Sequence, residues 1–270
     1  MIVKYATDSD KDQVLDFCTK TFSWGDYIAN VWDYWKEEGN LLVVHQNNSP
    51  VAVCHVSIFT QTNQVWIEGI RVNPNFRRKG YATHLVQEAE NISKKSNCLI
   101  AYMLIESTNT ASLELAKKLK YENFETWNFY SLTPKKIDSK IDIKFVSNVK
   151  KLPTILSSQN LFYVKSWRWF PLNDSSVSNL AQENRIIYFR DKNGIDSLAV
   201  ITDSEHFDNT MLVTVISGSI IGLKEIFTYV QNLSYQKNSK RIQILTKLKT
   251  LPNYNSLENR LTFYLMKKNI

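Results

Sequence analysis

Cysteine, histidine and glycine are all scarce in this sequence of 270 residues. It contains three cysteines, four histidines and seven glycines. Cys18, Cys54 and Cys98 lie far from one another, so they form neither a disulfide framework nor the paired spacing of a metal site. We therefore predict no metal ion, and we expect Cys54 and Cys98 to be buried as small apolar side chains.

Long apolar runs are also missing. No run approaches the roughly 18 residues that a membrane-spanning helix needs, and residues 1–5 lack the core of a signal peptide. With 43% hydrophobic and 12% aromatic residues, the chain is nevertheless too apolar to be disordered. These features together predict a globular cytoplasmic protein with no membrane partner.

Charge is divided unevenly between the two halves of the chain. Residues 1–133 carry 13 Lys/Arg and 15 Asp/Glu, a net charge of −2, whereas residues 134–270 carry 20 and 11, a net charge of +9. The first half also holds all three cysteines and three of the four histidines. Two halves of different chemistry, each near the common domain size, predict one domain over 1–133 and another over 134–270.

The positive second half raises the question of a nucleic-acid partner. Its lysines occur in separate pairs at 135–136, 150–151 and 267–268 rather than along one stripe. Scattered lysines are typical of an ordinary solvated surface, so we expect no nucleic-acid partner. A non-catalytic nucleic-acid-binding module stays open as an alternative of another class.

The first half alternates between strand and helix patterns. The expected strands span 2–6, 41–45, 51–59, 64–72, 98–105 and 121–131, and the expected helices lie near 14–18, 26–38, 82–95 and 110–120. In the strand at 64–72, alternation places Trp66, Glu68, Ile70 and Val72 on one face and Ile67 on the other. The order β-α-α-β-β-β-α-β-α-β predicts an α/β domain around a mixed sheet.

A basic loop with a glycine joins the strand at 64–72 to the next helix. Arg77, Arg78 and Lys79 precede Gly80. Unpaired N–H groups and the helix dipole attract anions at a helix N-terminus, and glycine lets the backbone come close to a phosphate. The loop therefore predicts a diphosphate site with three cations around it, although it is neither a Walker A motif nor a GxGxxG fingerprint.

Residues 65–82 resemble motif A of the GNAT superfamily of acetyltransferases. The Arg/Gln-x-x-Gly-x-Gly/Ala signature of that family falls on Arg77, Gly80 and Ala82, and a second motif is matched in part from Asn109 and Ser112 onward. The resemblance covers about residues 1–132. It implies a GNAT fold, with acetyl-CoA as the acetyl donor.

The resemblance also implies how acetyl-CoA is held. Amides of the loop are expected to bind the pyrophosphate, while the backbone around Ile70 and Val72 pairs with the pantetheine arm. The predicted binding residues are Ile70, Arg71, Val72, Arg77, Arg78, Lys79, Gly80, Tyr81, Ala82, Asn109 and Ser112.

Two catalytic roles need candidates. The amine must lose a proton, and Glu68 on the strand before the loop is the first candidate base, with Glu106 as the second. Glu68 could instead be an exposed strand residue or the partner of Arg71 or His55. His55 itself, like His84, is expected to be structural or solvated.

The acid is less clear because the sequence departs from the family at Ala116. Many family members have a tyrosine there that is proposed to protonate the leaving CoA thiolate. Tyr121 or Tyr81 could substitute, and of the two we retain Tyr121 as the catalytic candidate. Water could also supply the proton, or no acid is needed, because a thiol pKa near 8.5 makes the thiolate a fair leaving group.

The acceptor side is usually formed in this family by the first two helices and their connection. Here that connection includes residues 24–27, so we expect Trp24, Asp26 and Tyr27 to line the acceptor pocket. Asp26 could bind the ammonium group of a substrate, or it could cap the following helix.

The second half repeats the order of the first at an offset of about 142–146 residues. A strand hairpin at 185–202, a strand at 211–217, a helix at 222–235 and a strand at 241–245 follow one another as in the first half. Residues 216–222 contain glycines but lack the signature and its basic residues. We therefore expect a smaller, degenerate and non-catalytic GNAT-like domain that helps to close the acceptor site.

These features favour an acetyl-CoA-dependent N-acetyltransferase. The expected acceptor is the primary amine of a small molecule or amino acid, attacked directly in a ternary complex because no placed cysteine suggests an acyl-enzyme. A faint resemblance of residues 68–74 to histidine N-acetyltransferase-like proteins favours a free amino acid. A protein N-terminus or lysine is the alternative acceptor, a non-catalytic acyl-CoA-binding module is another alternative, and a homodimer stays open.

Overall fold

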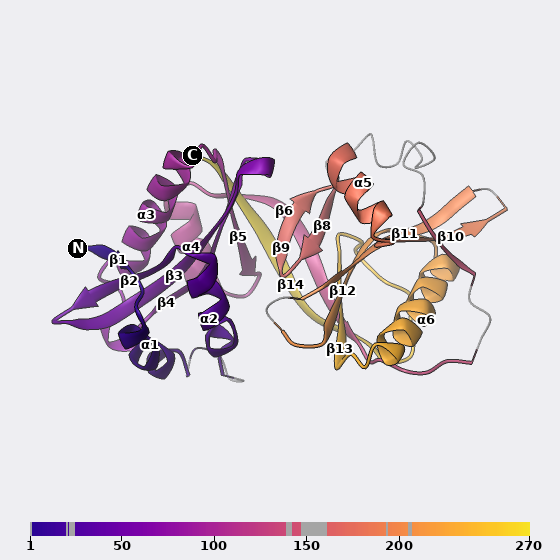
Figure 1. The fold of residues 1–270 in the computed structure, drawn as a ribbon, viewed down its shortest axis with the longest axis horizontal. Coiled ribbons are helices and arrows are strands. Elements are labelled where there is room, and N and C mark those ends of the chain that lie inside the picture. The colour runs from indigo at the N-terminus through magenta and orange to yellow at the C-terminus, as the bar shows by residue number, and fades with distance from the viewer. Residues whose placement is uncertain are drawn as a thin grey trace. The chain divides into compact units, whose positions relative to one another are not determined.

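A computed structural model of the protein describes residues 2–19, 21, 25–138, 142–146, 161–192, 194–204 and 207–270. Its contacts divide the chain into two compact units (Figure 1). Unit 1 comprises Met1–Glu125 and Tyr264–Ile270, and unit 2 comprises Thr126–Phe263. No helix among the described residues is long and apolar enough to cross a membrane.

Unit 1 has the predicted order of elements. These are β1 (Val3–Tyr5), α1 (Lys11–Cys18), α2 (Ile28–Glu38), β2 (Leu41–Gln46), β3 (Ser49–Phe59), β4 (Gln64–Val72), α3 (Tyr81–Lys95), β5 (Ile100–Glu106), α4 (Thr110–Lys118) and the start of β6 (Glu122–Leu132). Strands β1 to β4 pair antiparallel in sequence order, and β5 then pairs parallel to β4.

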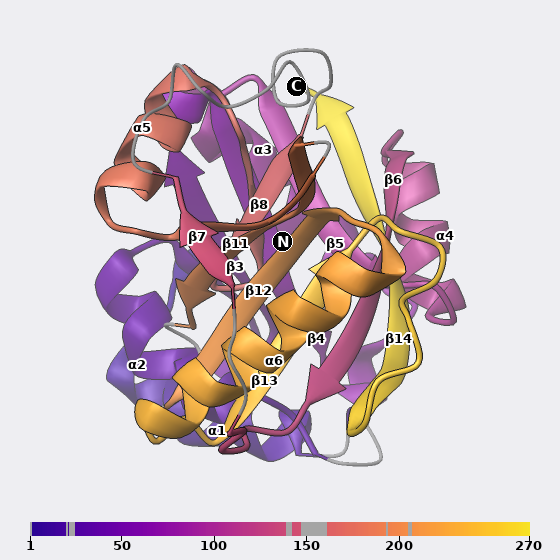
Figure 2. The same ribbon diagram turned by 90° about the vertical axis from the view of Figure 1, so that its right-hand side faces the viewer.

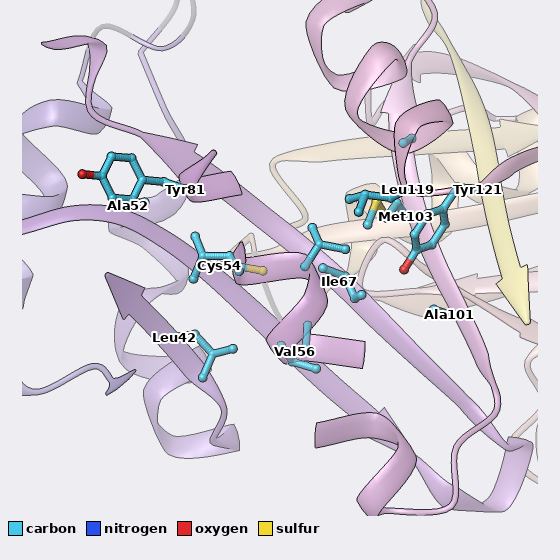
Figure 3. Close-up of a cluster of buried hydrophobic side chains, with 14 of the residues drawn as sticks. Leu42, Ala52, Cys54, Val56, Ile67, Tyr81, Ala101, Met103, Leu119 and Tyr121 are labelled. Carbon is cyan, nitrogen blue, oxygen red and sulfur yellow. The ribbon is translucent and has the colours of Figure 1, made fainter. Parts of the chain in front are cut away.

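Each face of the sheet in unit 1 is covered by helices. Leu42, Cys54, Ile67 and Met103 face a core shared with Leu85 of α3 (Figure 3). The other core belongs to α1 and α2, and its fully buried members include Val14, Ile28, Val31, Trp32, Val43 and Val53. A mixed sheet with helices on both faces confirms the predicted fold class.

The boundary between the units differs from the one expected at residue 133. Residues 128–132 of β6 pair antiparallel with β13 (Arg241–Thr246), so these hydrogen bonds place the second half of β6 in unit 2. At the other end of the chain, β14 (Leu257–Asn269) follows β5 in the strand order, and Ile270 N–H donates to the Leu99 carbonyl at 2.9 Å. The last seven residues therefore complete unit 1, a long-range pairing that composition cannot reveal.

Unit 2 repeats this architecture. It contains β7 (Ile143–Phe145), β8 (Phe162–Lys165), β9 (Arg168–Pro171), α5 (Asp174–Gln182), β10 (Ile186–Asp191), β11 (Gly194–Asp203), β12 (Thr210–Ser217), α6 (Ile220–Gln236) and β13. The strand order β7-β10-β11-β12-β13 matches β1-β2-β3-β4-β5 of unit 1. Helix α6 lies along this sheet and buries Leu223, Ile226, Phe227 and Val230 against it (Figure 2). The predicted internal repeat is therefore present in the fold.

Candidate active site

Strands β4 and β5 separate along their length. They pair only through residues 64–66 and 100–102, although β4 continues to Val72 and β5 to Glu106. The backbone of residues 67–72 thus has no β5 partner within this described part of the sheet. A strand edge that lacks a neighbouring strand can bind an extended ligand as an added strand. Ile70 and Val72, the residues expected to pair with the pantetheine arm, lie in this segment.

A β-bulge interrupts β4 at Gly69. Val53 is opposite Arg71 and His55 is opposite Glu68, so Gly69 and Ile70 together face Cys54 alone. Gly69 has a φ of +63°, and a Cβ atom there would lie 2.4 Å from the Trp35 ring. Glycine is therefore required both by the backbone conformation and by the close approach of Trp35.

The bulge changes which side chains share a face. Ile70 and Val72 pack against the core under α3, together with Ile67. Glu68, in contrast, contacts His55. The expected alternation, with Glu68, Ile70 and Val72 on one face, is wrong because one extra residue reverses the order of sides beyond Gly69.

The loop after β4 ends in an open helix N-terminus. Arg78 and Gly80 both adopt left-handed backbone, with φ of +63° and +84°. The first hydrogen bond of α3 runs from His84 N–H to the Gly80 carbonyl at 3.1 Å, and within the described residues no acceptor is found for the N–H groups of residues 78–83. A Cβ atom on Gly80 would meet nothing within 4 Å. These donors and the dipole of α3 make a site for an anion.

The three cations of this loop are exposed around that site. Arg77 Nε donates to the Val72 carbonyl at 3.3 Å, which holds its guanidinium beside the end of β4. Lys79 Nζ lies 5.1 Å from the centre of the Phe76 ring. Ala82 is half-buried in the first turn of α3, so its backbone is part of the same N-terminus.

Tyr81 contributes to the loop only through its backbone. Its side chain is buried in the core beneath α3, where it packs against Phe76 (Figure 3). Its hydroxyl donates to the side-chain oxygen of Gln46. The phenol oxygen is therefore bound to Gln46 at the end of β2 and does not fit the role of an acid at the site.

Glu68 forms a hydrogen bond with a buried histidine. Its Oε1 lies 2.9 Å from His55 Nδ1, and its side chain is 14% exposed. His55 is completely buried, stacked on Trp35 with ring centres 4.7 Å apart. Of the alternatives considered for Glu68, the structure shows pairing with His55.

Asp26 and Arg71 form a buried ion pair. Arg71 Nε and Nη2 donate to the two oxygens of Asp26 at 2.6 and 3.1 Å, and the Asp26 side chain is only 3% exposed. Asp26 Oδ1 also accepts the N–H of Ile28, the first residue of α2, at 3.2 Å, although the N-cap of that helix is Tyr27. Both carboxylate oxygens are thus engaged, which is not the arrangement expected for a residue that binds a substrate ammonium group.

The side chain of Arg71 is likewise not turned toward the phosphate loop. Besides Asp26, it contacts the Ile70 carbonyl at 3.2 Å and lies over the Tyr27 ring at 5.3 Å. Burial lowers the pKa of Arg71, but Tyr27 and Asp26 raise it more, so the net shift is upward and the residue stays charged. Arg71 can contribute to acetyl-CoA binding only through its backbone on β4.

Tyr27 stands at the edge of this cluster, where burial raises its pKa. Its ring makes an edge contact with Trp35 at 6.0 Å. Trp24, the other aromatic residue expected in the acceptor pocket, lies outside the described residues.

Tyr121 is held in the interior of unit 1. Its hydroxyl donates to Glu90 Oε1 at 3.0 Å, and Lys268 Nζ lies 2.7 Å from both Glu90 oxygens. Burial and the charge of Glu90 raise the pKa of Tyr121 above its ordinary value. A phenol with a raised pKa and a committed proton is a poor acid for a thiolate, so the geometry does not favour the expected catalytic role.

The remaining predicted residues lie at the end of β5 and the start of α4. The side-chain oxygen of Asn109 accepts the Ser112 N–H at 3.2 Å and thereby caps α4. Glu106 accepts a hydrogen bond from the Thr108 hydroxyl at 2.7 Å. Among the described residues, no group of three or more His, Cys, Asp or Glu side chains could hold a metal ion.

Two residues near Glu68, Glu38 and Gly69, were not predicted as part of the site, whereas His55 was considered as a partner of Glu68. Gly69 left a signal in the sequence, because an isolated glycine within a strand indicates a bulge or a close backbone approach. Glu38 reaches the site through the packing of α2, which no local pattern reveals.

Comparison with known proteins agrees with this geometry. Residues 12–121 match the model of the Acetyltransferase (GNAT) family. A comparison with curated protein sequences finds no match.

Three solved structures share the fold over nearly the whole chain. A candidate acetyltransferase from Thermoplasma acidophilum has a TM-score of 0.66 at 14% identity, with 100% of both chains covered. A GCN5-related N-acetyltransferase from Sphaerobacter thermophilus has a TM-score of 0.64 at 12% identity, covering 99% of this chain and 95% of its own. A tandem GNAT protein from the clavulanic acid biosynthesis pathway has a TM-score of 0.56 at 8% identity, covering 99% and 98%.

Proposed function

Because residues 12–121 match the model of the Acetyltransferase (GNAT) family, we propose that this protein transfers the acetyl group of acetyl-CoA to the primary amine of a small molecule or amino acid. The observation that carries the proposal is the separation of β4 from β5 directly before an open helix N-terminus. The separated edge of β4 suits an extended arm, and the helix N-terminus suits a pyrophosphate. Acetyl-CoA contains both groups.

The residues of β4 and the loop fit acetyl-CoA in distinct ways. The edge of β4 that β5 leaves at residues 67–72 suits the pantetheine arm, and the N–H groups of residues 78–83 suit the pyrophosphate. Arg77, Arg78 and Lys79 add positive charge at the surface of the loop. Bound acetyl-CoA supplies the acetyl group as a thioester and leaves as the thiol.

Glu68 is proposed as the base. It lies on β4 at the bulge, beside the strand segment proposed for the pantetheine arm. It accepts the proton that the amine nitrogen loses as that nitrogen bonds to the acetyl carbon. The carbon–sulfur bond breaks, and the thiolate takes its proton from water, because Ala116 and the interior position of Tyr121 leave no protein acid among the predicted candidates.

The acceptor class and the cellular setting are the finer parts of the proposal. A free amino acid is favoured by the resemblance of residues 68–74, and peptides are the competing acceptors. All three cysteines are free and buried, which supports direct transfer and a reducing cytoplasm.

Calorimetry with acetyl-CoA tests the binding site. Gly80→Glu places a carboxylate at the open N-terminus of α3 and a side chain on left-handed backbone, so we expect at least about a 10-fold loss of affinity. Gly194→Glu is the matched control, because Gly194 also has positive φ and open space around its Cβ position but lies in the hairpin of unit 2. Equal affinity in the wild type and the Gly80 variant would remove the loop from the site.

A screen of acceptors tests the reaction. Release of free CoA is measured with amino acids, polyamines and peptides that carry a free N-terminus or lysine. Turnover with small amines and little with peptides is the expected result. Faster turnover with peptides would overturn the small-molecule assignment, and acetyl-CoA binding without turnover on any acceptor would favour a non-catalytic module.

A further inference from the structure

We propose that His55 is a positioning residue that holds Glu68 and shares one proton with it, so that the two side chains form a single acid–base unit. The inference rests on the role of Glu68 in the proposed function. It starts from the position of the His55 ring between two hydrogen-bond acceptors, since Nδ1 lies 2.9 Å from Glu68 Oε1 and Nε2 lies 3.0 Å from the Gly39 carbonyl oxygen.

The donors and acceptors determine how many protons the pair holds. A carbonyl oxygen can only accept, so His55 Nε2 must carry a hydrogen toward Gly39. The contact between Nδ1 and Glu68 then needs a second hydrogen. That hydrogen resides either on Nδ1, as an imidazolium beside a carboxylate, or on Glu68, as a carboxylic acid beside a neutral ring. In both forms the pair has no net charge and shares a single proton.

The surroundings hold the ring in this one orientation. Trp35 stacks on His55 with an interplanar angle of 7°, and the absence of a Cβ atom on Gly69 allows Trp35 to take that position. A ring flip would require Trp35 and Gly39 to move, because His55 has no exposed surface. The orientation of Glu68 is therefore set by a rigid neighbour rather than by solvent.

Other ionisable groups face the pair from every adjoining element. Glu38 of α2 lies 3.6 Å from Nε2 and accepts the Ser57 hydroxyl. Burial and the charge of Glu68 both raise the pKa of Cys54 on β3 and the pKa of Tyr27. The charge of Arg71 on β4 is balanced by Asp26. Glu38 and Glu68 thus lie beside the two different ring nitrogens of His55.

This arrangement suits a base in a dry site. The hydrogen bond to His55 orients the Glu68 carboxylate, which receives the proton of the amine. The amine nitrogen loses that proton, the carboxylate gains it, and His55 keeps the Nε2 hydrogen that points to Gly39. His55 touches neither the amine nor the acetyl group, so its effect appears in turnover rather than in binding.

Two variants of His55 separate positioning from packing. His55→Asn places an amide near Nδ1 and keeps a donor to Glu68, whereas His55→Gln places it near Nε2 and keeps only the contact to Gly39. We expect kcat to fall about 10-fold or more in His55→Gln and less in His55→Asn. In both variants the KM for acetyl-CoA stays within about twofold, and in His55→Gln the acid limb of the pH profile moves, because Glu68 no longer shares a proton with the ring.

His45→Asn is the matched control. It removes another hydrogen bond between a histidine and a carboxylate in unit 1, the one from His45 to Asp10, without touching Glu68, so it should leave kcat and the pH profile unchanged. Calorimetric binding of acetyl-CoA checks that each variant is folded. If the variants fail to fold, nitrogen-15 NMR of the wild-type protein tests the proposal instead, by showing which ring nitrogens of His55 carry a hydrogen. A hydrogen on Nε2 is expected there, and a ring with its hydrogen on Nδ1 alone would overturn the proposal.

The Glu68→Gln variant distinguishes the two ways in which this can fail. If Glu68→Gln keeps full activity, the base is elsewhere and the role of His55 falls with it. If Glu68→Gln is inactive but His55→Gln keeps the kcat and pH profile of the wild type, Glu68 stays the base and only the inference on His55 is wrong.

Discussion

The two units place the same elements in the same order but differ where a ligand would bind. In unit 1, β4 and β5 pair through three residues each and then separate. In unit 2, β12 and β13 pair through six, from Thr210 and Arg241 to Val215 and Thr246. The continuous ladder in unit 2 leaves no strand backbone for an added arm.

The N-termini of the corresponding helices differ in the same sense. At the start of α3, the N–H groups of residues 78–83 have no acceptor among the described residues. At α6, Ser219 accepts the Gly222 N–H at 3.2 Å, and its own hydroxyl donates to Asp196 Oδ2 at 2.8 Å. A Cβ atom on Gly222 would lie 2.0 Å from that oxygen, so a carboxylate already occupies the place of a bound anion. The site therefore depends on local departures from regular pairing and capping, not on the fold itself.

Among the substitutions that compare the two units, Glu68→Gln in unit 1 should have the largest effect, a loss of turnover. Loss of a general base typically lowers turnover by about 10² to 10⁴, while acetyl-CoA affinity should be unchanged because β4 and the loop remain intact. Steady-state kinetics and calorimetry measure the two quantities. Glu106→Gln is the comparison variant, since Glu106 lies on β5 and contacts Thr108. A larger loss in the Glu106 variant would transfer the role of base to it.

Gly69→Ala should remove the bulge that distinguishes β4 from a regular strand. The new methyl group would meet the Trp35 ring at 2.4 Å on left-handed backbone. Overpacking and backbone strain together predict a loss of about 3 kcal/mol in the free energy of unfolding of unit 1. Denaturant unfolding monitored by tryptophan fluorescence measures this loss. Gly194→Ala, with positive φ but open space, should cost less, and equal losses would show that contact with Trp35 does not matter.

Much of the fold and the open helix N-terminus after the loop at 77–82 could be predicted from the sequence because both depend on local patterns. The strand and helix order of unit 1 and of residues 185–245 follows from periodicity and turn residues, and the loop at 77–82 is one contiguous segment. The repeat in unit 2 was visible for the same reason. Loss of the signature residues there agrees with a helix N-terminus that is capped by Ser219 and Asp196.

The partner of Asp26 could not be predicted, because it comes from a distant position. Asp26 and Arg71 are 45 residues apart in sequence, and each alone resembles a ligand-binding residue. His55 was one of the alternative partners of Glu68, and it lies directly opposite Glu68 in the β3–β4 ladder, where Gly69 lets Trp35 cover its ring. The place of the last residues in unit 1 could not be predicted for the same reason, since it depends on contacts such as that of Lys268 with Glu90.

Tyr121→Phe tests whether the interior of unit 1 takes part in the chemistry. The Tyr121 hydroxyl is bound to Glu90, so its removal should leave kcat within about twofold of the wild-type value. The free energy of unfolding should fall by about 1 kcal/mol, because Glu90 loses a buried donor. Tyr254→Phe removes a comparable hydrogen bond to Gln231 in unit 2 and serves as the control. A drop in kcat of tenfold or more, confined to the Tyr121 variant, would restore that residue as the acid.

Asp196→Asn should produce the smallest change, and it probes the contrast between the units most directly. The substitution removes the negative charge at the N-terminus of α6, which predicts a loss of about 0.5 kcal/mol in the free energy of unfolding. Calorimetry should still find one acetyl-CoA per chain, because the ladder between β12 and β13 remains closed. Gly80→Glu in the same background should weaken that binding as it does alone. A second site that appears in Asp196→Asn and persists with Gly80→Glu would show that a single carboxylate, rather than strand pairing, keeps unit 2 from binding acetyl-CoA.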